Sequence, residues 1–219
     1  MLSYSRRGSR LTPAQAAAWA EHHDAWVIPD EAVEEPGFSW AERFGRTAPL
    51  VVEIGSGVGE ATVALAARHP DVDVVAFEVW RPGVAATLQR LAEADVGNVR
   101  LCSVDAVWSL EHLVGEGMLH ELWTFFPDPW RKSRHHKRRL VSPRFAALAA
   151  DRLTPGAWWR LATDWGDYAT QMQDVLGAEP RLAGGVVPRW DERPVTRFER
   201  KGLAAGREIV DLAYQRVEP

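Results

Sequence analysis

A cluster of glycines directly after a short apolar run is the first feature of this sequence that could do chemistry. Residues 53–59 read Glu-Ile-Gly-Ser-Gly-Val-Gly. A tight glycine turn between a strand and a helix lets a ligand approach the backbone, and the helix N-terminus favours polar groups. The spacing differs from the Gly-x-Gly-x-x-Gly of dinucleotide-binding turns, and Glu53 would repel a pyrophosphate. The turn therefore favours a binding site for S-adenosylmethionine, which has no phosphate and is cationic. The alternative is an ordinary strand–helix connection that binds no ligand.

Two further acids follow the next two apolar runs. Glu78 ends the run that starts at Val72, and Asp105 follows the run Val99–Val104. In open α/β sheets, ligands lie at the carboxyl ends of the strands, where a carboxylate can accept both hydroxyls of a ribose. We therefore expect Glu78 to hold a ribose and Asp105 to reach the adenine or its ribose. Taken alone, either acid is also typical of a helix cap or a solvated surface.

A proline-rich turn follows the fourth apolar run. Residues 125–130 read Phe-Phe-Pro-Asp-Pro-Trp, so two prolines fix the backbone around Asp128 and Trp130. A hydrogen-bond acceptor beside a flat aromatic ring is what holding a nucleobase requires. The alternative is a proline-rich loop with a buried tryptophan.

The nine residues after this turn are strongly basic. The segment Arg131–Arg139 holds 6 of the 26 Lys and Arg residues, although the 219-residue chain has a formal net charge of −4. Local charge matters more than total charge for attracting a polyanion. We therefore expect this basic segment to bind nucleic-acid phosphates. The pair His135–His136 has no acid or cysteine partner at metal-ligand spacing, so we predict no metal.

Alternating strands and helices must position these residues. Strands are expected at Leu50–Ile54, Val72–Glu78, Val99–Val104, Leu119–Phe126 and Trp158–Thr163, and helices at Val58–Arg68, Pro82–Ala94, Ala106–Val114, Ser142–Leu153 and Trp165–Leu176. This alternation predicts a mostly parallel sheet with right-handed crossovers and helices on both faces. The period of two in Ile209–Val217 predicts an edge strand.

The first 49 residues are expected to form an extension ahead of a domain at residues 50–219. Arg6, Arg7 and Arg10 make a basic arm. Thr12-Pro13 is a good helix start, so a helix is expected to about Glu21. Residues 29–46 are rich in Pro, Gly and acid and read as a loop.

Composition excludes several other classes of protein. Hydrophobic residues make up 46% of the chain and charged residues 26%, as in ordinary globular proteins. Apolar stretches are shorter than the ~18–20 residues of a membrane helix, and the N-terminus lacks the apolar core of a secretory signal. A single cysteine, Cys102, cannot form an internal disulfide. We therefore expect a cytoplasmic protein.

Taken together, these motifs resemble the bacterial tRNA (guanine-N7)-methyltransferase family, usually called TrmB, of class I S-adenosylmethionine-dependent methyltransferases. The resemblance runs from Arg10 to about Arg216 and rests on the glycine turn, on Phe126–Arg139, and on the later blocks Ala162–Trp165 and Arg193–Glu199. It implies a Rossmann-like fold, with a mostly parallel seven-stranded sheet and one antiparallel edge strand. It also implies methyl transfer to N7 of guanosine 46 in the tRNA variable loop.

The resemblance implies roles for individual residues. Cofactor contacts would come from Glu53, Gly55, Gly57, Gly59, Glu78, Asp105 and Asp128. Asp128 would also be the catalytic residue. The substrate nucleotide would be held by Lys132, Asp164, Thr196, Arg197, Phe198 and Glu199, and the RNA would be contacted by Arg134, His135, His136, Lys137, Arg138 and Arg139. The implied partner is tRNA, with the protein a monomer or a homodimer.

The sequence departs from the family pattern at several positions. Ser56 and Val58 stand where larger residues are preferred, and Arg197 stands where Lys is usual. Lys201 replaces an Arg, and Arg207 replaces the His of a late Gly-His pair. At position 197, the Arg in place of a Lys keeps the charge but changes the hydrogen-bonding geometry.

Three other functions are alternatives to this one. A nucleic-acid amino-methyltransferase is disfavoured by the Asp128-Pro-Trp130 turn, which the basic segment follows. A nicotinamide-dependent oxidoreductase is disfavoured by Glu53 and by the missing Tyr-x-x-x-Lys pair. A non-catalytic RNA-binding module would bind RNA without any affinity for the cofactor.

Overall fold

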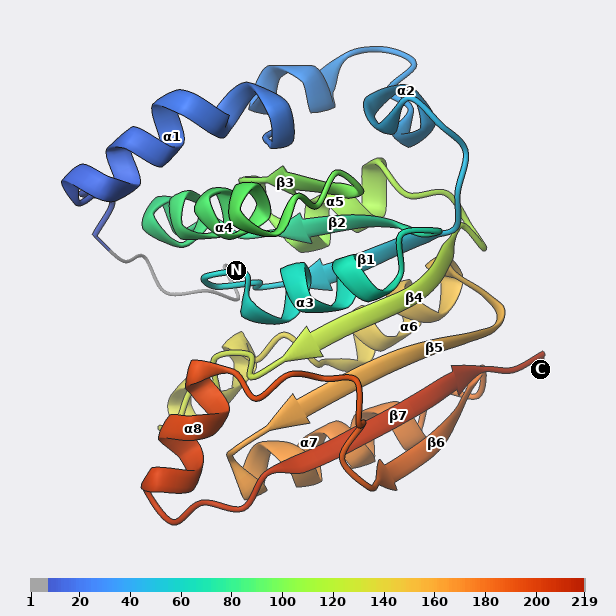
Figure 1. The fold of residues 1–219 in the computed structure, drawn as a ribbon. Helices are drawn as coiled ribbons and strands as arrows, with labels where there is room; N and C mark the ends of the chain where they lie inside the picture. Colours follow the sequence, from blue (N-terminus) through green and yellow to red (C-terminus); the bar gives the residue numbers. More distant parts are fainter. Residues whose placement is uncertain (1–7, 219) are drawn as a thin grey trace. The chain divides into compact units, whose positions relative to one another are not determined.

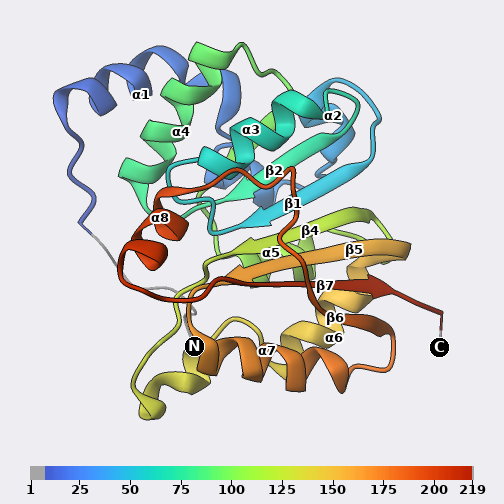
Figure 2. The ribbon, with the colours of Figure 1, turned by 60° about the horizontal axis from the view of Figure 1, so that its bottom comes forward.

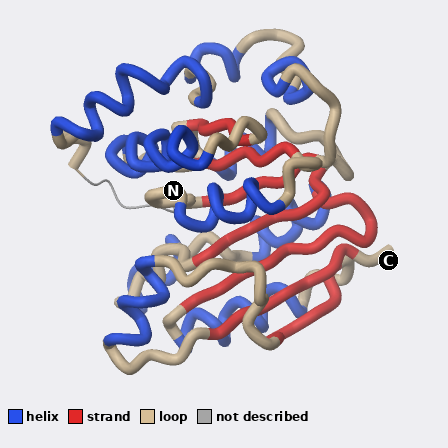
Figure 3. The backbone as a smooth tube through the Cα atoms, viewed as in Figure 1, coloured by secondary structure: helices blue, strands red, loops and turns tan. Residues whose placement is uncertain are grey.

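The computed structural model describes residues 8–218, which divide between two compact units. The N-terminal unit comprises residues 8–114 and 192–194, and the C-terminal unit comprises residues 115–191 and 195–218. The predicted basic-arm residues Arg6 and Arg7 lie outside the described residues. Helices and strands alternate along the chain in both units (Figure 3).

Three parallel strands form the centre of the N-terminal unit. β1 (Leu50–Ile54), β2 (Asp73–Phe77) and β3 (Val99–Cys102) pair in the order β3-β2-β1. β1 and β2 are buried along their whole length, as their near-continuous apolar sequences predict for parallel strands. α3 (Glu60–Arg68) packs on β2 and β3, α4 (Arg81–Ala94) packs on α3, and α1 (Pro13–Trp26) lies along α4 (Figure 1).

The segment before β1 contains more helix than the sequence predicts. α1 continues to Trp26, and the expected loop at 29–46 contains a 3₁₀ helix, η1 (Asp30–Glu34), and a short helix, α2 (Trp40–Phe44). Burial explains α2, because the Trp40 ring is buried and its Nε1 donates to the Leu113 carbonyl at 2.8 Å. α5 (Ala106–His112) follows β3, as expected. A domain boundary at residues 49/50 stays a prediction.

Four strands form the sheet of the C-terminal unit. β4 (Leu119–Phe125), β5 (Leu153–Thr163), β6 (Leu182–Val187) and β7 (Val210–Arg216) pair in the order β4-β5-β7-β6. β4 and β5 are parallel, and β7 is antiparallel to both of its neighbours. α6 (Pro143–Arg152) and α7 (Gly166–Gly177) pack against these strands (Figure 2). The remaining helices are η2 (Ser133–Arg138) and α8 (Arg197–Ala204).

The strand predicted at 209–217 is present as β7 and is antiparallel, but it does not lie at the edge. β6, which the sequence analysis did not predict, pairs along its outer side. β6 escapes prediction because its centre is Gly184-Gly185, and glycine is depleted in strands. Gly184 has a packing reason, since a Cβ there would clash with the carbonyl oxygen of Ala213. Among residues 8–218, no helix is both long enough and apolar enough to cross a membrane.

The two adjacent glycines of β6 allow a matched test of this packing. Gly184→Ala should lower the free energy of unfolding by about 1–3 kcal/mol, because the new methyl group displaces the backbone of β7. Gly185→Ala is the control, since a Cβ there meets nothing within 4 Å; stability should be unchanged or rise by about 0.5–1 kcal/mol. Urea unfolding measures both values. Equal effects of the two substitutions would contradict this packing.

Candidate functional site

The glycine turn between β1 and α3 is tightly packed at one end and open at the other. Gly55, Gly57 and Gly59 have φ angles of +76°, +64° and +74°, which other residues rarely adopt. A Cβ on Gly59 would lie 2.5 Å from Cγ2 of Thr87, so that end is closed by α4. A Cβ on Gly55 would meet nothing within 4 Å. A ligand can therefore approach the backbone at Gly55.

The carboxylate of Glu78 holds this turn in place. Its Oε2 accepts a hydrogen bond from the Gly57 amide, and its Oε1 accepts one from the Trp80 amide, both at 2.7 Å. A carboxylate has about four acceptor positions, so it can accept more hydrogen bonds than these two. The structure thus brings together the glycine turn and the acid that the sequence predicted as a ribose acceptor.

Glu53 lies buried at the end of β1. Its carboxyl group accepts a hydrogen bond from the Thr62 hydroxyl at 2.5 Å. Burial, together with the negative charge of Glu78, raises the pKa of Glu53 to about 7, although the Thr62 hydrogen bond acts in the opposite direction. A cation bound nearby would favour the ionised form. Thr62 was not identified from the sequence, where a helical threonine carries no distinguishing signal.

The remaining predicted residue of the N-terminal unit, Asp105, caps α5. Its Oδ1 accepts from the amides of Val107 and Trp108 at 3.0 and 3.1 Å, which is the alternative that the sequence left open. Ser56 adds an unexpected feature, because its Oγ is buried and has no hydrogen-bond partner within residues 8–218. An open backbone, two acids and an unpaired hydroxyl fit a cationic ligand with hydrogen-bonding groups, and they do not fit a pyrophosphate.

In the C-terminal unit, the Asp128 turn is bounded by two strained residues. Phe126 and Trp130 have φ angles of +54° and +44°, in the left-handed region that costs a residue with a Cβ roughly 1–2 kcal/mol. The Phe126 amide donates to the Ala162 carbonyl at 2.7 Å, which ties the start of the turn to the end of β5. Such strain persists only where neighbouring groups fix the conformation.

Arg139 fixes the other side of this turn. Its side chain is 1% exposed, and the guanidinium donates to the Pro129 carbonyl at 2.9 Å, to Gln171 Oε1 at 2.7 Å and to Asp167 Oδ2 at 2.5 Å. The hydrogen bond from Arg139 also holds the pKa of Asp167 below its usual range. The prediction that Arg139 contacts RNA needs revision, because its donors are used inside the protein.

The other members of the basic segment are more accessible. Lys132, Arg134 and Lys137 are exposed, and His135, His136 and Arg138 are partly buried. The Arg138 guanidinium lies 3.6 Å from the centre of the Trp130 ring, and the His135 ring contacts Trp130 edge-on. The His136 ring lies 3.0 Å from the Arg139 guanidinium. This segment therefore presents exposed cations, and the buried hydrogen bonds of Arg139 anchor its end.

The predicted substrate residues at 196–199 have roles in local structure. Thr196 caps α8 by accepting from the Glu199 amide, and Glu199 is buried in an ion pair with Arg189 at 2.9 Å. Arg197 is exposed, and its guanidinium lies over the neighbouring ring of Phe198. Thr196 and Glu199 therefore fix α8, whatever they contact in a complex.

Asp164 follows β5, just as the Asp128 turn follows the neighbouring parallel strand β4. Two nitrogens of Arg207, Nε and Nη2, contact Asp164 Oδ2 at 2.9 and 2.8 Å. Arg207 was noted in the sequence only as a departure from the family pattern. Within residues 8–218, no group of three or more His, Cys, Asp or Glu side chains could hold a metal ion.

The raised pKa of Glu53 predicts a pH-dependent stability. Between pH 4.5, the ordinary pKa, and about 7, the folded protein binds more protons than the unfolded chain, so its stability falls as the pH rises. Glu53→Gln removes this ionisation and keeps an acceptor for Thr62. The variant should therefore gain stability relative to the unchanged protein between about pH 5 and pH 8, by up to about 3 kcal/mol. Urea unfolding across that range measures the difference, and a constant difference would contradict the prediction.

Sequence comparisons identify relatives along the whole chain. A family described as "Putative methyltransferase" matches residues 47–212. A tRNA (guanine-N(7)-)-methyltransferase of Nocardioides sp. (strain ATCC BAA-499 / JS614) is 67% identical over 216 residues, which are 99% of this chain and 87% of that protein. A protein of the same name from Cutibacterium acnes is 49% identical over 100% of this chain and 84% of its own length.

Solved structures with low sequence identity share the fold. The 16S rRNA methyltransferase KamB has a TM-score of 0.58 at 18% identity, covering 84% of this chain and 96% of that one. An rRNA methylase from Streptococcus thermophilus has a TM-score of 0.52 at 18% identity, over 78% of this chain and 88% of its own. These likenesses confirm the Rossmann-like methyltransferase fold. With the sequence matches, they lead to one conclusion: the chain belongs to the tRNA (guanine-N(7)-)-methyltransferase family of class I methyltransferases.

Proposed function

We propose that this protein transfers the methyl group of S-adenosylmethionine to N7 of guanosine 46 in the variable loop of tRNA, in the cytoplasm. The observation that carries the choice of donor is the glycine turn, which is open at Gly55 and flanked by the carboxyl groups of Glu53 and Glu78. The names of the relatives support N7 of a tRNA guanine as the acceptor.

Residues of the N-terminal unit would hold the cofactor. Glu78 would accept from the ribose, the backbone at Gly55 would lie against the ligand, and Asp105 would reach the adenine side. The buried carboxyl group of Glu53 would ionise beside the ligand's positive charge. When bound, S-adenosylmethionine supplies an electrophilic methyl group on a sulfonium.

The acceptor atom needs no deprotonation. Guanine N7 carries a free lone pair at neutral pH, so methyl transfer can be a single in-line displacement. Alignment of the reactants alone can contribute about 7–11 kcal/mol to such a step. The base becomes cationic as the bond forms, and in this proposal the Asp128 carboxylate positions the guanine and stabilises that charge.

The basic segment would bind the RNA around the target nucleotide. Its exposed side chains Lys132, Arg134 and Lys137 can contact phosphates, and the Trp130 ring can stack on or wall the base. Asp164 and the block Thr196–Glu199 would hold the nucleotide. In this scheme Arg139 supports the segment from within, because its guanidinium is buried.

Product analysis tests the proposed reaction. Unmodified tRNA transcript is incubated with the protein and S-adenosylmethionine, digested to nucleosides and analysed by mass spectrometry. We expect N7-methylguanosine, and we expect none from a transcript with adenosine at position 46. An N-methylated exocyclic amine would support the amino-methyltransferase alternative. RNA binding with no cofactor affinity would support the RNA-binding module.

Two arginines of the basic segment should respond differently to removal. Arg134→Ala should lower the slope of log affinity for tRNA against log salt by about 0.7–0.9, because one exposed phosphate contact is lost. Arg139→Ala should instead lower the free energy of unfolding by about 2–4 kcal/mol, because a buried hydrogen-bonded network is broken. Filter binding and urea unfolding measure the two effects. A stable Arg139 variant with a reduced salt slope would place Arg139 on the RNA.

A further inference from the structure

The ion pair between Asp164 and Arg207 is asymmetric. Both Arg207 nitrogens contact Oδ2 of the carboxylate, at 2.9 and 2.8 Å. Within residues 8–218, no hydrogen bond to Oδ1 is found, and the Asp164 side chain is 20% exposed. The pair therefore fixes the orientation of the carboxylate and leaves its second oxygen as an acceptor.

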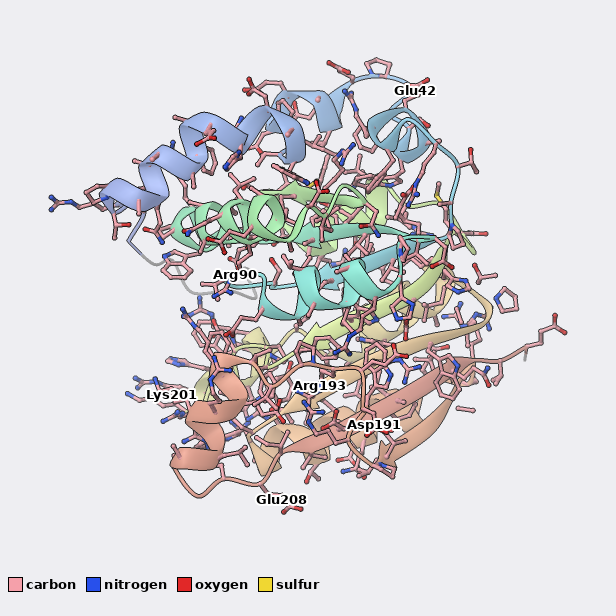
Figure 4. All side chains as sticks on the ribbon, in the orientation of Figure 1. Glu42, Arg90, Asp191, Arg193, Lys201 and Glu208 are labelled. Carbon is pink, nitrogen blue, oxygen red and sulfur yellow. The ribbon has the colours of Figure 1, made fainter. Side chains whose placement is uncertain are left out.

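The end of α8 holds both partners of this pair. A Cβ on Gly202 would lie 2.9 Å from Cβ of Asp164 and 3.1 Å from its Oδ2, so only a glycine lets the helix approach this closely. The Arg207 amide donates to the Gly202 carbonyl at 3.0 Å, across a turn in which Gly206 has a φ of +69°. Figure 4 labels Lys201 on the helix and Glu208 after the turn, which bracket this region. Arg207 is thus fixed by its backbone as well as by its side chain.

We propose that Arg207 is a positioning residue that orients the Asp164 carboxylate toward the substrate guanine. This inference rests on the proposed function. Guanine presents N1–H and a 2-amino group on the edge opposite N7, and a carboxylate oxygen accepts from such donors, whereas adenine presents an acceptor at N1. Arg207 acts through Asp164 and not on the RNA itself.

The buried residues of α8 support the same arrangement. Thr196 caps the helix and Glu199 is tied to Arg189, so the helix is anchored at its start. Gly202, one turn later, then meets Asp164 at a fixed position. The block that resembles a substrate-binding motif therefore also builds the support beneath Asp164.

Two other roles for Arg207 make different predictions. If Arg207 bound an RNA phosphate, its removal would lower the salt slope of tRNA binding by about 0.7–0.9. If Arg207 only stabilised the fold, its removal would lower the thermal midpoint, and its effect on tRNA affinity would be independent of Asp164. Removal of a positioning residue leaves the salt slope unchanged. It also has no effect on tRNA affinity in a protein that already lacks the partner, because the residue acts only through that partner.

A double-mutant cycle on tRNA binding tests the proposal. The dissociation constant of unmodified tRNA is measured by filter binding, without cofactor and at several salt concentrations, for Arg207→Ala, Asp164→Asn and the double variant. We expect Arg207→Ala to weaken binding about tenfold with an unchanged salt slope, and by less than twofold in the Asp164→Asn background. Arg207→Lys, which keeps the positive charge but offers a single donor nitrogen, should recover part of the loss. Lys201→Ala is the matched control, since it removes an exposed cation from α8, close to Arg207 in the chain, and its effect should add to that of Asp164→Asn.

The outcomes separate this inference from the proposed function. A lower salt slope for Arg207→Ala, or an equal loss of affinity in both backgrounds, would overturn the positioning role even if N7-methylguanosine is formed. If the double-mutant cycle gives the expected result but the methylated nucleoside is not N7-methylguanosine, the positioning role stands and the proposed acceptor atom is wrong. A complete absence of tRNA binding would overturn both.

Discussion

The hydrogen bond from the buried Arg139 guanidinium to the Pro129 carbonyl is the contact on which the Asp128 turn depends. Phe126 and Trp130 are held in left-handed conformations that cost roughly 1–2 kcal/mol each. Hydrogen bonds from a charged donor contribute about 1.5–3 kcal/mol each, so the Arg139–Pro129 bond is comparable in size to that strain, and the bonds to Gln171 and Asp167 hold the guanidinium in place. Because the turn is fixed before any ligand binds, Asp128 needs no reorganisation to act on a base, which is what electrostatic preorganisation requires.

In the N-terminal unit, a negatively charged side chain fixes the backbone of a turn in a comparable way. There the Glu78 carboxylate accepts from the amides of Gly57 and Trp80 and so holds a turn made of left-handed glycines. In both units a charged side chain binds the backbone of a conformationally costly turn, and the turn follows directly from a buried parallel strand. At Asp164 the charged partner binds a side chain instead: Arg207 and the close approach of Gly202 fix the carboxylate itself, after the parallel strand β5. The chemistry proposed for this protein is mostly alignment, and rigid turns are the structural means of alignment.

The sequence predicted the parts of the fold that depend on local pattern. The buried strands β1 to β5 and the glycine turn carry continuous apolar runs or glycines at fixed spacing, which are visible without tertiary information. It did not predict α2 or β6, because α2 forms through the burial of Trp40 and β6 through glycines that pack against β7. It also placed Arg139 among exposed cations, because a charge run has no internal sign that one member turns inward. The contact of Arg207 with Asp164 joins residues 43 positions apart and had no local signal.

The central claim is that Asp128 acts on a developing positive charge and removes no proton, and the pH dependence of the methyl-transfer step tests it most directly. Single-turnover rates would be measured with saturating tRNA and S-adenosylmethionine, between about pH 6 and pH 9, for the unchanged protein and for Asp128→Asn. We predict rates that are nearly independent of pH in both proteins, with the variant slower by a factor of about 10²–10³ throughout. A rate that rises tenfold per pH unit in the unchanged protein and is abolished in the variant would contradict the claim and make Asp128 a general base. An Asn variant with the full rate would leave Asp128 with a purely structural role.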